Sequence, residues 1–481
     1  MVSACQNKSS NQQKEEVKAV SEKPNIIVIF ADDLGYADLG ANGSVTDIKT
    51  PNLDELANTG VRMTSGYVTA PQCVPSRAGL LTGRYQERFG TDHNGTRPLP
   101  LNERTIADRM QTAGYTTGMA GKWHLEPLHV EADWIKEEMP ELAASGNKPK
   151  MGDIPFERKI PYLSSRRGFQ QVFDGRYNKY WATYNFQGED IEEQFVEQEG
   201  YRLDVQTDAT VAFIKKNKDN PFFFYLAYYA PHVPLEATEN YLSRFPGDMP
   251  ERRRYCLAMM SAIDDGVGKI KSTLRELGLE ENTMIYFIGD NGAPLKIYKE
   301  DRTLEFKGGA WDGSLNDPFV GEKGMISEGG IRVPFIVNWP AGLPNGKVYD
   351  RPVISLDMAA TSLAMAGLEQ PGELDGVNLL PFLNGEKQGD PHNALYWRFW
   401  QQTAIREGDF KYLTAGDRKY LFNVATEEHE TKNLLSQYPD KARDLRKKLE
   451  SWASELKNPG IPSGELKREK KWFDHYFAFN E

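Results

Sequence analysis

The chain has 481 residues, of which 39% are hydrophobic and 11% aromatic, and a formal net charge of −11 at pH 7. This length is too great for one small core and predicts one large domain with a smaller one. The acidic charge argues against a nucleic-acid-binding protein, and it requires any anion site to be a local basic pocket in an acidic body.

Residues 1–23 are predicted to form a disordered tail. Val2-Ser3-Ala4-Cys5 resembles the end of a bacterial lipoprotein signal, in which the cysteine is lipidated and becomes the mature N-terminus. The apolar stretch that should precede it is missing, and the residues after Cys5 are polar and lack aromatics. Two interpretations stay open: an ordinary tail, or a membrane tether through Cys5 that would place the protein in the periplasm or cell envelope.

From Asn25 the pattern predicts an α/β protein. The continuous apolar run NIIVIF at 25–30 is typical of a buried parallel strand. Further strands are predicted at 222–228, 284–289 and 335–339, and helices at 50–58 and 251–277. Cys256 falls on the apolar stripe of the last helix, so we expect a buried core thiol. Residues 130–198 are rich in charge and aromatics and are predicted to form irregular surface loops. Residues 24–385 would then form one domain, a large mixed, mostly parallel sheet between helices.

The pattern of apolar and charged residues changes near residue 385. Short apolar runs at 395–400, 403–405 and 410–413 predict antiparallel strands, and a charged helix is predicted at 440–456. Residues 386–481 are therefore predicted to form a small α+β subdomain.

Polar side chains follow two of the predicted strands. Asp32 and Asp33 end the first strand, and Asp290 and Asn291 end the strand at 284–289. Taken singly, such residues are common helix caps and turn formers. Because open α/β sheets bind ligands at the carboxyl ends of their strands, the two pairs can bring four oxygen donors to one point. Oxygen donors favour Ca²⁺ or Mg²⁺ over Zn²⁺.

Five basic or titratable residues lie in loops bounded by glycine or proline, or close to such loops. They are Arg77, Lys122, His124, His232 and Lys323. A lone lysine would be a solvated surface residue, and a lone histidine a satisfied core group. Beside a divalent cation site, however, the five predict a pocket for an oxyanion, which is the local basic pocket that the net charge requires.

The run Cys73–Arg84, CVPSRAGLLTGR, favours the functional interpretation of these acidic and basic residues over the structural one. A nucleophilic thiol usually needs a histidine and an amide or acid to activate it, and nothing in this run provides them. The run resembles the C-x-P-S-R-x-x-x-L-T-G signature of the type I, formylglycine-dependent sulfatases of the alkaline phosphatase-like superfamily. From about Asn25 onward, further segments are similar to this family in family order, among them GKWHL, APHVP, DNGA and EGGIRVPFIV.

The resemblance implies the fate of Cys73 and a metal site. Cys73 would be oxidised after translation to Cα-formylglycine (3-oxoalanine) by a formylglycine-generating or anaerobic sulfatase-maturating enzyme. One metal ion, Ca²⁺ in preference to Mg²⁺, would be held by Asp32, Asp33, Asp290, Asn291 and the modified Cys73.

The resemblance also implies roles for the basic residues. A hydroxyl of the aldehyde hydrate would attack sulfur, while Lys122, Lys323 and Arg77 stabilise the sulfate and the hydrate. His232 would protonate the leaving oxygen and, with both lysines, bind the substrate. His124 would take the proton of the second hydroxyl, so that the aldehyde re-forms and sulfate is expelled.

The sequence departs from the family pattern at two places. Glu126 stands where the family commonly has glycine, and Phe319-Val320 stands where many relatives carry Leu-Arg. The predicted catalytic positions are unaffected, so these departures concern substrate contacts.

Three other functions stay open: a phosphonate monoester or phosphodiester hydrolase of the same superfamily, a simple arylsulfatase, and a non-catalytic binder of sulfated glycans. We expect a sulfatase acting on a sulfated polysaccharide or oligosaccharide, such as algal ulvan or carrageenan. The basic and aromatic segments at 166–167, 176–181 and 396–400 either stack on sulfated sugar rings or form rim and core packing. The roles of Arg166, Arg167 and Arg398 stay open.

Overall fold

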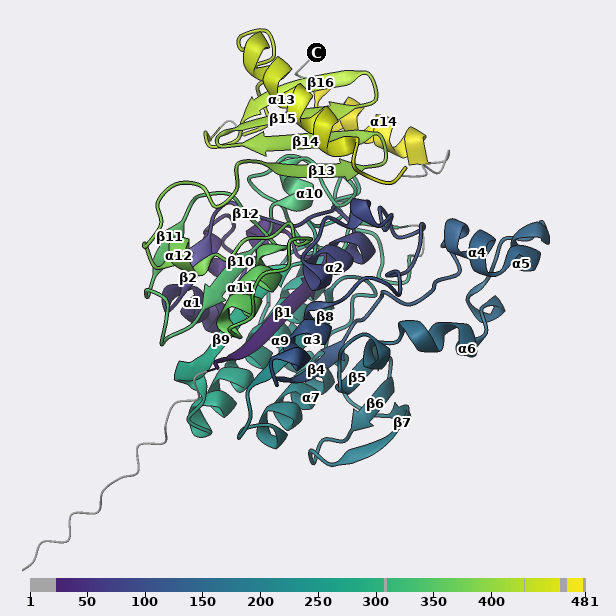
Figure 1. Cartoon of the computed structure of the whole chain (residues 1–481), viewed down its shortest axis with the longest axis vertical. Coiled ribbons are helices and arrows are strands. Elements are labelled where there is room, and N and C mark those ends of the chain that lie inside the picture. Colours follow the sequence, from purple (N-terminus) through teal and green to yellow (C-terminus); the bar gives the residue numbers. More distant parts are fainter. Residues whose placement is uncertain (1–22, 307–308, 428, 459–464, 479–481) are drawn as a thin grey trace, which may run out of the picture.

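A large sheet flanked by helices carries a second, smaller sheet at its C-terminal end (Figure 1). The computed structural model describes residues 23–306, 309–427, 429–458 and 465–478. Cys5 lies outside these residues, so its lipidation stays a prediction. Within them, no helix is both long and apolar enough to cross a lipid bilayer.

Ten strands of the described chain form the large sheet, in the order β11-β2-β10-β9-β1-β8-β4-β5-β6-β7. Neighbouring strands from β9 to β5 are parallel, whereas β10 and the β5-β6-β7 edge pair antiparallel. The strands are β1 (Asn25–Asp32), β2 (Val61–Met63), β4 (Thr116–Gly121), β5 (Gln171–Arg176), β6 (Lys179–Tyr184), β7 (Asp190–Glu197), β8 (Phe222–Pro231), β9 (Thr283–Gly289), β10 (Phe335–Asn338) and β11 (Lys347–Tyr349). The predicted mixed, mostly parallel sheet is confirmed.

The core lies on both faces of the large sheet. Alternate residues of β1 point to opposite faces, so that Val28 and Phe30 join one apolar cluster and Ile27 and Ile29 join the other. The first cluster includes residues of α2 (Cys73–Thr82), α3 (Ile106–Thr112) and α11 (Asp357–Met365), and the second includes residues of α1 (Pro51–Asn58), α7 (Arg202–Lys216) and α9 (Glu251–Glu276). Cys256 of α9 is fully buried, which confirms the predicted core thiol.

The prediction of irregular loops at 130–198 is wrong for much of that range. Strands β5, β6 and β7 extend the large sheet as an antiparallel edge, and α4 (Ala132–Glu138), α5 (Pro140–Ala144) and α6 (Phe156–Lys159) precede them. The edge strand β7, DIEEQFVE, buries none of its residues. An edge strand of this kind carries charges instead of an apolar run, so its sequence lacks the signal of a buried strand.

The small sheet is antiparallel, in the order β13-β14-β15-β16. Its strands are β13 (Leu395–Phe399), β14 (Gln402–Glu407), β15 (Phe410–Ala415) and β16 (Arg418–Asn423), and α13 (Pro439–Ala453) packs against it. The predicted α+β subdomain is confirmed, but β16 and α14 (Glu465–Tyr476) were not predicted. The remaining described strands and α-helices are β3 (Gly66–Tyr67), β12 (Val353–Ile354), α8 (Glu239–Leu242), α10 (Glu328–Ile331) and α12 (Leu380–Leu383).

Candidate active site

Two neighbouring strands end side by side and place their acidic side chains together. β1 and β9 are paired in parallel, and the backbone N–H of Asp290 donates to the carbonyl of Ala31 at 2.8 Å. The backbone N–H of Asp33 in turn donates to Asp290 Oδ1 at 2.8 Å. Asp33 has a φ of 61°, a left-handed conformation that non-glycine residues rarely adopt and that is concentrated at functional sites.

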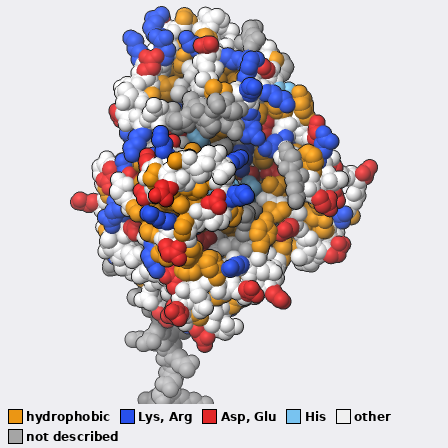
Figure 2. All heavy atoms as spheres, turned by 90° about the vertical axis from the view of Figure 1, so that its right-hand side faces the viewer, with side chains coloured by type: hydrophobic (Ala, Val, Ile, Leu, Met, Phe, Trp, Pro, Cys, Tyr) orange, Lys and Arg blue, Asp and Glu red, His pale blue; other side chains and the backbone are white. Residues whose placement is uncertain are grey.

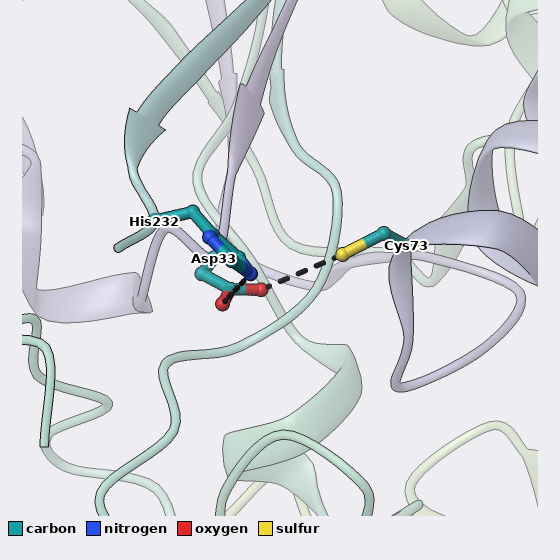
Figure 3. Close-up of side chains that lie close together, drawn as sticks. All are labelled: Asp33, Cys73 and His232. Carbon is teal, nitrogen blue, oxygen red and sulfur yellow. Dashed lines mark hydrogen bonds and ion pairs between the residues drawn. The ribbon is translucent and has the colours of Figure 1, made fainter. Parts of the chain in front are cut away.

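Cys73 is the first residue of α2, and its buried thiol faces these strand ends (Figure 3). The Sγ atom donates to Asp32 Oδ1 at 3.3 Å and to Asp33 Oδ1 at 3.8 Å, and it accepts from Lys323 Nζ at 3.4 Å. Asn94 accepts a hydrogen bond from the N–H of Val74 at 3.0 Å, which holds the first turn of the helix. The N-terminus of a helix favours negative charge, so this is a suitable place for an anion.

The donor atoms near Cys73 fit a divalent cation. Ligand atoms of Asp32, Asp33, Cys73 and Asp290 all lie within 4.8 Å of one another, and all four residues are buried. Asn291 adds a further oxygen, because its Nδ2 donates to Asp33 at 2.7 Å while its buried Oδ1 has no partner among the described residues. Carboxylate and amide oxygens are the ligands of hard cations such as Ca²⁺.

Three cationic side chains surround the three carboxylates. Lys122 Nζ contacts both oxygens of Asp32 at 2.9 and 2.7 Å, and Lys323 Nζ contacts both oxygens of Asp33 at 2.6 and 2.7 Å. Arg77 Nη2 lies 2.7 Å from Asp290 Oδ2. The protein's own charges therefore nearly cancel, and a divalent cation added to them would give the site the positive charge that an oxyanion requires.

The pKa values of the carboxyl groups differ. Burial alone would raise the pKa of Asp32, but Lys122 and the other nearby cations hold it well below its usual value. Burial raises the pKa of Asp290 to about 7, and the charge of Asp32 adds to this. A bound divalent cation would oppose that rise and keep the crowded carboxyl groups ionised.

The thiol of Cys73 is not activated by its surroundings. Burial raises its pKa well above the ordinary value, and the charges of Asp290 and Asp32 raise it further. Thiols that act as nucleophiles have lowered pKa values. The environment thus agrees with a cysteine that is a precursor of the reactive group.

Two histidines lie at the same site. Burial lowers the pKa of His124 well below its usual value, and Lys122 and Arg77 lower it further. Its buried Nδ1 has no partner among the described residues, and its φ is 59°. Burial also lowers the pKa of His232, whose Nε2 lies 3.5 Å from Asp33 Oδ2 (Figure 3). A neutral histidine can accept a proton, and an anion bound beside His232 would raise its pKa.

The structure brings all of the predicted site residues to one edge of the large sheet, and it adds two that sequence reasoning missed. Arg77 Nη1 donates to the hydroxyl of Tyr225 at 3.1 Å. Asn316 accepts from the backbone N–H of Ala293 and donates to the carbonyls of Ala293 and Gly321, which joins the loop after Asn291 to the loop before Lys323. Tyr225 lies within the apolar run of β8, and Asn316 in an irregular loop, so neither carried a sequence signal.

Most of the basic and aromatic residues that the sequence offered as candidates for sugar stacking, at 166–167 and 396–400, pack against other parts of the protein. Arg167 donates to three backbone carbonyls, and Arg398 forms a buried ion pair with Asp92 at 2.7 Å. Arg166 pairs with Glu193 on the surface, and Tyr396 stacks on a tryptophan of α13. These contacts favour rim and core packing over sugar stacking.

A cavity of about 530 Å³ opens beside the active-site residues. Its lining includes Asp33, His232 and Lys323, together with Lys296 and Asp312. Figure 2 shows a hollow below the C-terminal part of the molecule, with histidine and basic side chains in it.

Comparison with known proteins identifies the family. The family described as Sulfatase matches residues 24–368. The chain belongs to the sulfatase family. Residues 320–457 of this sulfatase also match a family described as N-sulphoglucosamine sulphohydrolase, C-terminal. The mouse N-acetylgalactosamine-6-sulfatase is 32% identical over 81% of the chain and 72% of its own length. Human arylsulfatase D is 32% identical over 78% of the chain and 70% of its own length. The protein is a sulfuric ester hydrolase.

Solved structures also share the fold of this chain. The crystal structure of Ps i-CgsB in complex with k-i-k-neocarrahexaose superposes with a TM-score of 0.75 at 30% identity, over 95% of this sulfatase and 99% of that chain. A phosphonate monoester hydrolase from Silicibacter pomeroyi has a TM-score of 0.61 at 21% identity, over 91% of the chain and 96% of its own, which shows a shared fold alone.

Proposed function

We propose that this sulfatase removes sulfate from a sulfated carbohydrate, using a Cα-formylglycine made from Cys73 and one bound Ca²⁺. The observation that carries the proposal is the position of Cys73. Its Sγ lies at the start of α2 within 3.3–3.8 Å of Asp32, Asp33 and Lys323. In this structure Sγ stands for the oxygens that the modified residue would carry.

The cation would be held by Asp32, Asp33, Asp290 and Asn291, with residue 73 completing the set. Two observations support this assignment: the Oδ1 of Asn291 has no hydrogen-bond partner among the described residues, and the pKa of Asp290 is raised. When bound, the cation would act as a Lewis acid on an oxygen of the sulfate. Addition of water to the formylglycine aldehyde would give a hydrate, whose hydroxyl is the attacking group that a buried, protonated thiol does not supply.

The basic side chains would then bind the sulfate. Lys122 and Lys323 reach the site from two different loops and would neutralise sulfate oxygens, while Arg77 orients Asp290 from within α2. His232 lies at the wall of the cavity and would give a proton to the leaving oxygen. His124, whose pKa is lowered well below its usual value by burial and by Lys122 and Arg77, would accept the proton that releases sulfate.

The relatives support a carbohydrate substrate. The mouse relative is named as an N-acetylgalactosamine-6-sulfatase, and the solved structure with the TM-score of 0.75 holds a neocarrahexaose. We propose a galactose-containing sulfated glycan, such as carrageenan, as the first substrate to test, with ulvan as the second algal candidate.

The experiment measures release of inorganic sulfate from sulfated galactose and N-acetylgalactosamine, carrageenan and ulvan oligosaccharides, and 4-nitrophenyl sulfate. The protein is co-expressed with a maturating enzyme, and the variant Cys73→Ala is the blank. Mass spectrometry of the peptide that contains residue 73 reports whether the cysteine has become the aldehyde.

We expect release from at least one sulfated sugar, and none from Cys73→Ala. Activity with an unmodified Cys73 would exclude the formylglycine. Release from 4-nitrophenyl sulfate alone would point to a simple arylsulfatase. Converted protein that acts on no sulfate ester would point to phosphonate or phosphodiester substrates, which should then be tested.

A further inference from the structure

Among the described residues, a carboxyl group beside the active-site residues has no hydrogen-bond partner in any other residue. Asp312 is fully buried, and neither of its side-chain oxygens is paired within the described part of the chain. Buried polar atoms of folded proteins are nearly always paired, and leaving one unpaired costs stability. An unpaired carboxyl group at a cavity can be paired by a molecule bound there.

Asp312 lines the same cavity as Asp33, His232 and Lys323. The volume of this cavity, about 530 Å³, is typical of small-molecule sites, which span roughly 300–1,000 Å³. Lys323 contacts both Asp33 and the Sγ atom of Cys73, so a sulfate ester held at residue 73 meets the cavity at Lys323. The group that carries the sulfate would extend past His232 into the space next to Asp312.

Within the described chain, no ion pair joins Asp312 to a cationic side chain of the cavity wall, although the charges of Lys323 and Lys296 act on it. Arg252 donates to the backbone carbonyls of Arg302, Thr303 and Trp311, which uses its guanidinium group for loop packing. Lys323 is held by Asp33. Burial keeps the pKa of Asp312 well above its usual value, although Lys323 and Lys296 partly oppose this. Ionised or protonated, a carboxyl group can hydrogen-bond to hydroxyl groups.

We propose that Asp312 is a specificity-determining residue that hydrogen-bonds to ring hydroxyls of the sugar bearing the scissile sulfate. This inference rests on the proposed carbohydrate sulfatase function. Adjacent hydroxyls of a sugar ring can satisfy both oxygens of Asp312, whereas an aryl sulfate brings none. A buried polar group that is paired only by the correct substrate discriminates strongly against analogues that lack the hydroxyl.

The test compares Asp312→Asn and Asp312→Leu with the wild-type protein, all co-expressed with the maturating enzyme. The kcat/KM is measured on sulfated galactose, N-acetylgalactosamine 6-sulfate, carrageenan oligosaccharides and 4-nitrophenyl sulfate. Inhibition by inorganic sulfate checks that the anion site is intact. Glu87→Gln is the matched control, because Glu87 is also fully buried with both oxygens unpaired among the described residues but does not line this cavity.

For Asp312→Leu we expect kcat/KM on the sugar substrate to fall by at least about 10²-fold, while activity on the aryl sulfate and inhibition by sulfate change by less than about threefold. The free energy of unfolding should stay the same or rise, since an unpaired buried group has been removed. Asp312→Asn should give a smaller loss on the sugar, because an amide also bonds hydroxyls. Glu87→Gln should leave all of these quantities unchanged.

Three outcomes would overturn the inference. Sugar hydrolysis that is unchanged in Asp312→Leu would overturn it and leave the proposed function intact. Equal losses on the sugar and aryl substrates, or a clear loss of stability, would assign Asp312 a structural or electrostatic role instead. A wild-type protein that cleaves the aryl sulfate but no sugar would overturn the carbohydrate proposal, and this inference with it.

Discussion

Arg77 and Asp290 form a fully buried ion pair that ties the middle of α2 to the residue that follows β9. Arg77 Nη2 lies 2.7 Å from Asp290 Oδ2 and 3.3 Å from Asp32 Oδ1, and all three side chains are inaccessible to solvent. The helix that carries Cys73 is thus fixed to the strand end that carries the proposed metal ligands. This pair links the position of the reactive residue to that of the cation.

Replacing Arg77 by alanine should strongly destabilise the protein. The change removes the cation paired with Asp290 and leaves Asp32 with Lys122 alone, and breaking such a buried pair typically costs about 3–5 kcal/mol. Urea denaturation measures the free energy of unfolding. Arg244→Ala is the control, because its pair with Asp265 is partly exposed and should contribute at most about 1 kcal/mol. Equal effects of the two changes would contradict this account of Arg77.

Replacing Asn291 by alanine should weaken Ca²⁺ binding by at least about tenfold, or about 1.4 kcal/mol, because an oxygen ligand is removed. Titration calorimetry of protein treated with a chelator measures this affinity without reference to catalysis. Asn384→Ala removes an exposed amide far along the chain and should leave the affinity unchanged. A wild-type protein that binds no Ca²⁺ would remove that ion from the proposal.

Gly292 should not tolerate a side chain. A Cβ at this position would lie 1.9 Å from the carbonyl oxygen of Gly329, so the backbone beside Asn291 would have to move. We expect Gly292→Ala to cost about 1–3 kcal/mol of stability, as overpacking does, and to weaken Ca²⁺ binding. In Gly372→Ala the added Cβ meets no atom within 4 Å, which makes it the control. Similar melting temperatures and affinities for the two variants would show that the site adapts.

Lys411 of β15 lies between two buried acids of the subdomain boundary. Its Nζ is 2.9 Å from Glu328 of α10 and 3.0 Å from Glu430, and all three side chains are fully buried. Lys411→Met should cost about 3–5 kcal/mol, since the cation between these two buried acids is removed and Glu328 keeps only its pair with Arg332. Lys441→Ala breaks a partly exposed pair with Glu407 and should cost at most about 1 kcal/mol.

Hydrogen exchange can locate the effect of Lys411→Met. We expect faster exchange in α10 and in the small sheet than in the centre of the large sheet, because the lost contact joins those two elements. Uniformly faster exchange throughout the chain would contradict a local role for Lys411.

The His392–Asp357 pair should make stability depend on pH. Burial alone would lower the pKa of His392, but Asp357, 2.7 Å from its Nε2, outweighs this and raises the pKa above the ordinary 6.5. Because the folded state binds this proton more tightly, the contribution is fully present below pH 6.5 and is lost as the pH rises through the higher folded-state value. The free energy of unfolding, measured from pH 5 to 9, should show this loss in the wild-type protein and not in His392→Gln.

The sequence by itself determined the class of fold and the membership of the site. An apolar run followed by Asp32 and Asp33 predicted a strand that ends at a ligand-binding edge, because local hydrophobicity and strand ends are encoded by adjacent residues. The run around Cys73 and its neighbours predicted the family through fixed spacing. Edge strand β7 was missed because its charges hide the alternation that a sequence pattern depends on.

Only the tertiary structure decided how these residues act on one another. The contact of Arg77 with Asp290 joins residues 213 positions apart, and the position of Asp312 beside Lys323 depends on loop packing that no local pattern encodes. Asp312 and Asn291 have oxygens without a partner in the described part of the chain, and this is likewise a property of the packed site, since only folding determines which buried groups find partners. The short-range signals gave the chemistry of the site, and the long-range contacts gave its charge balance and the cavity next to it.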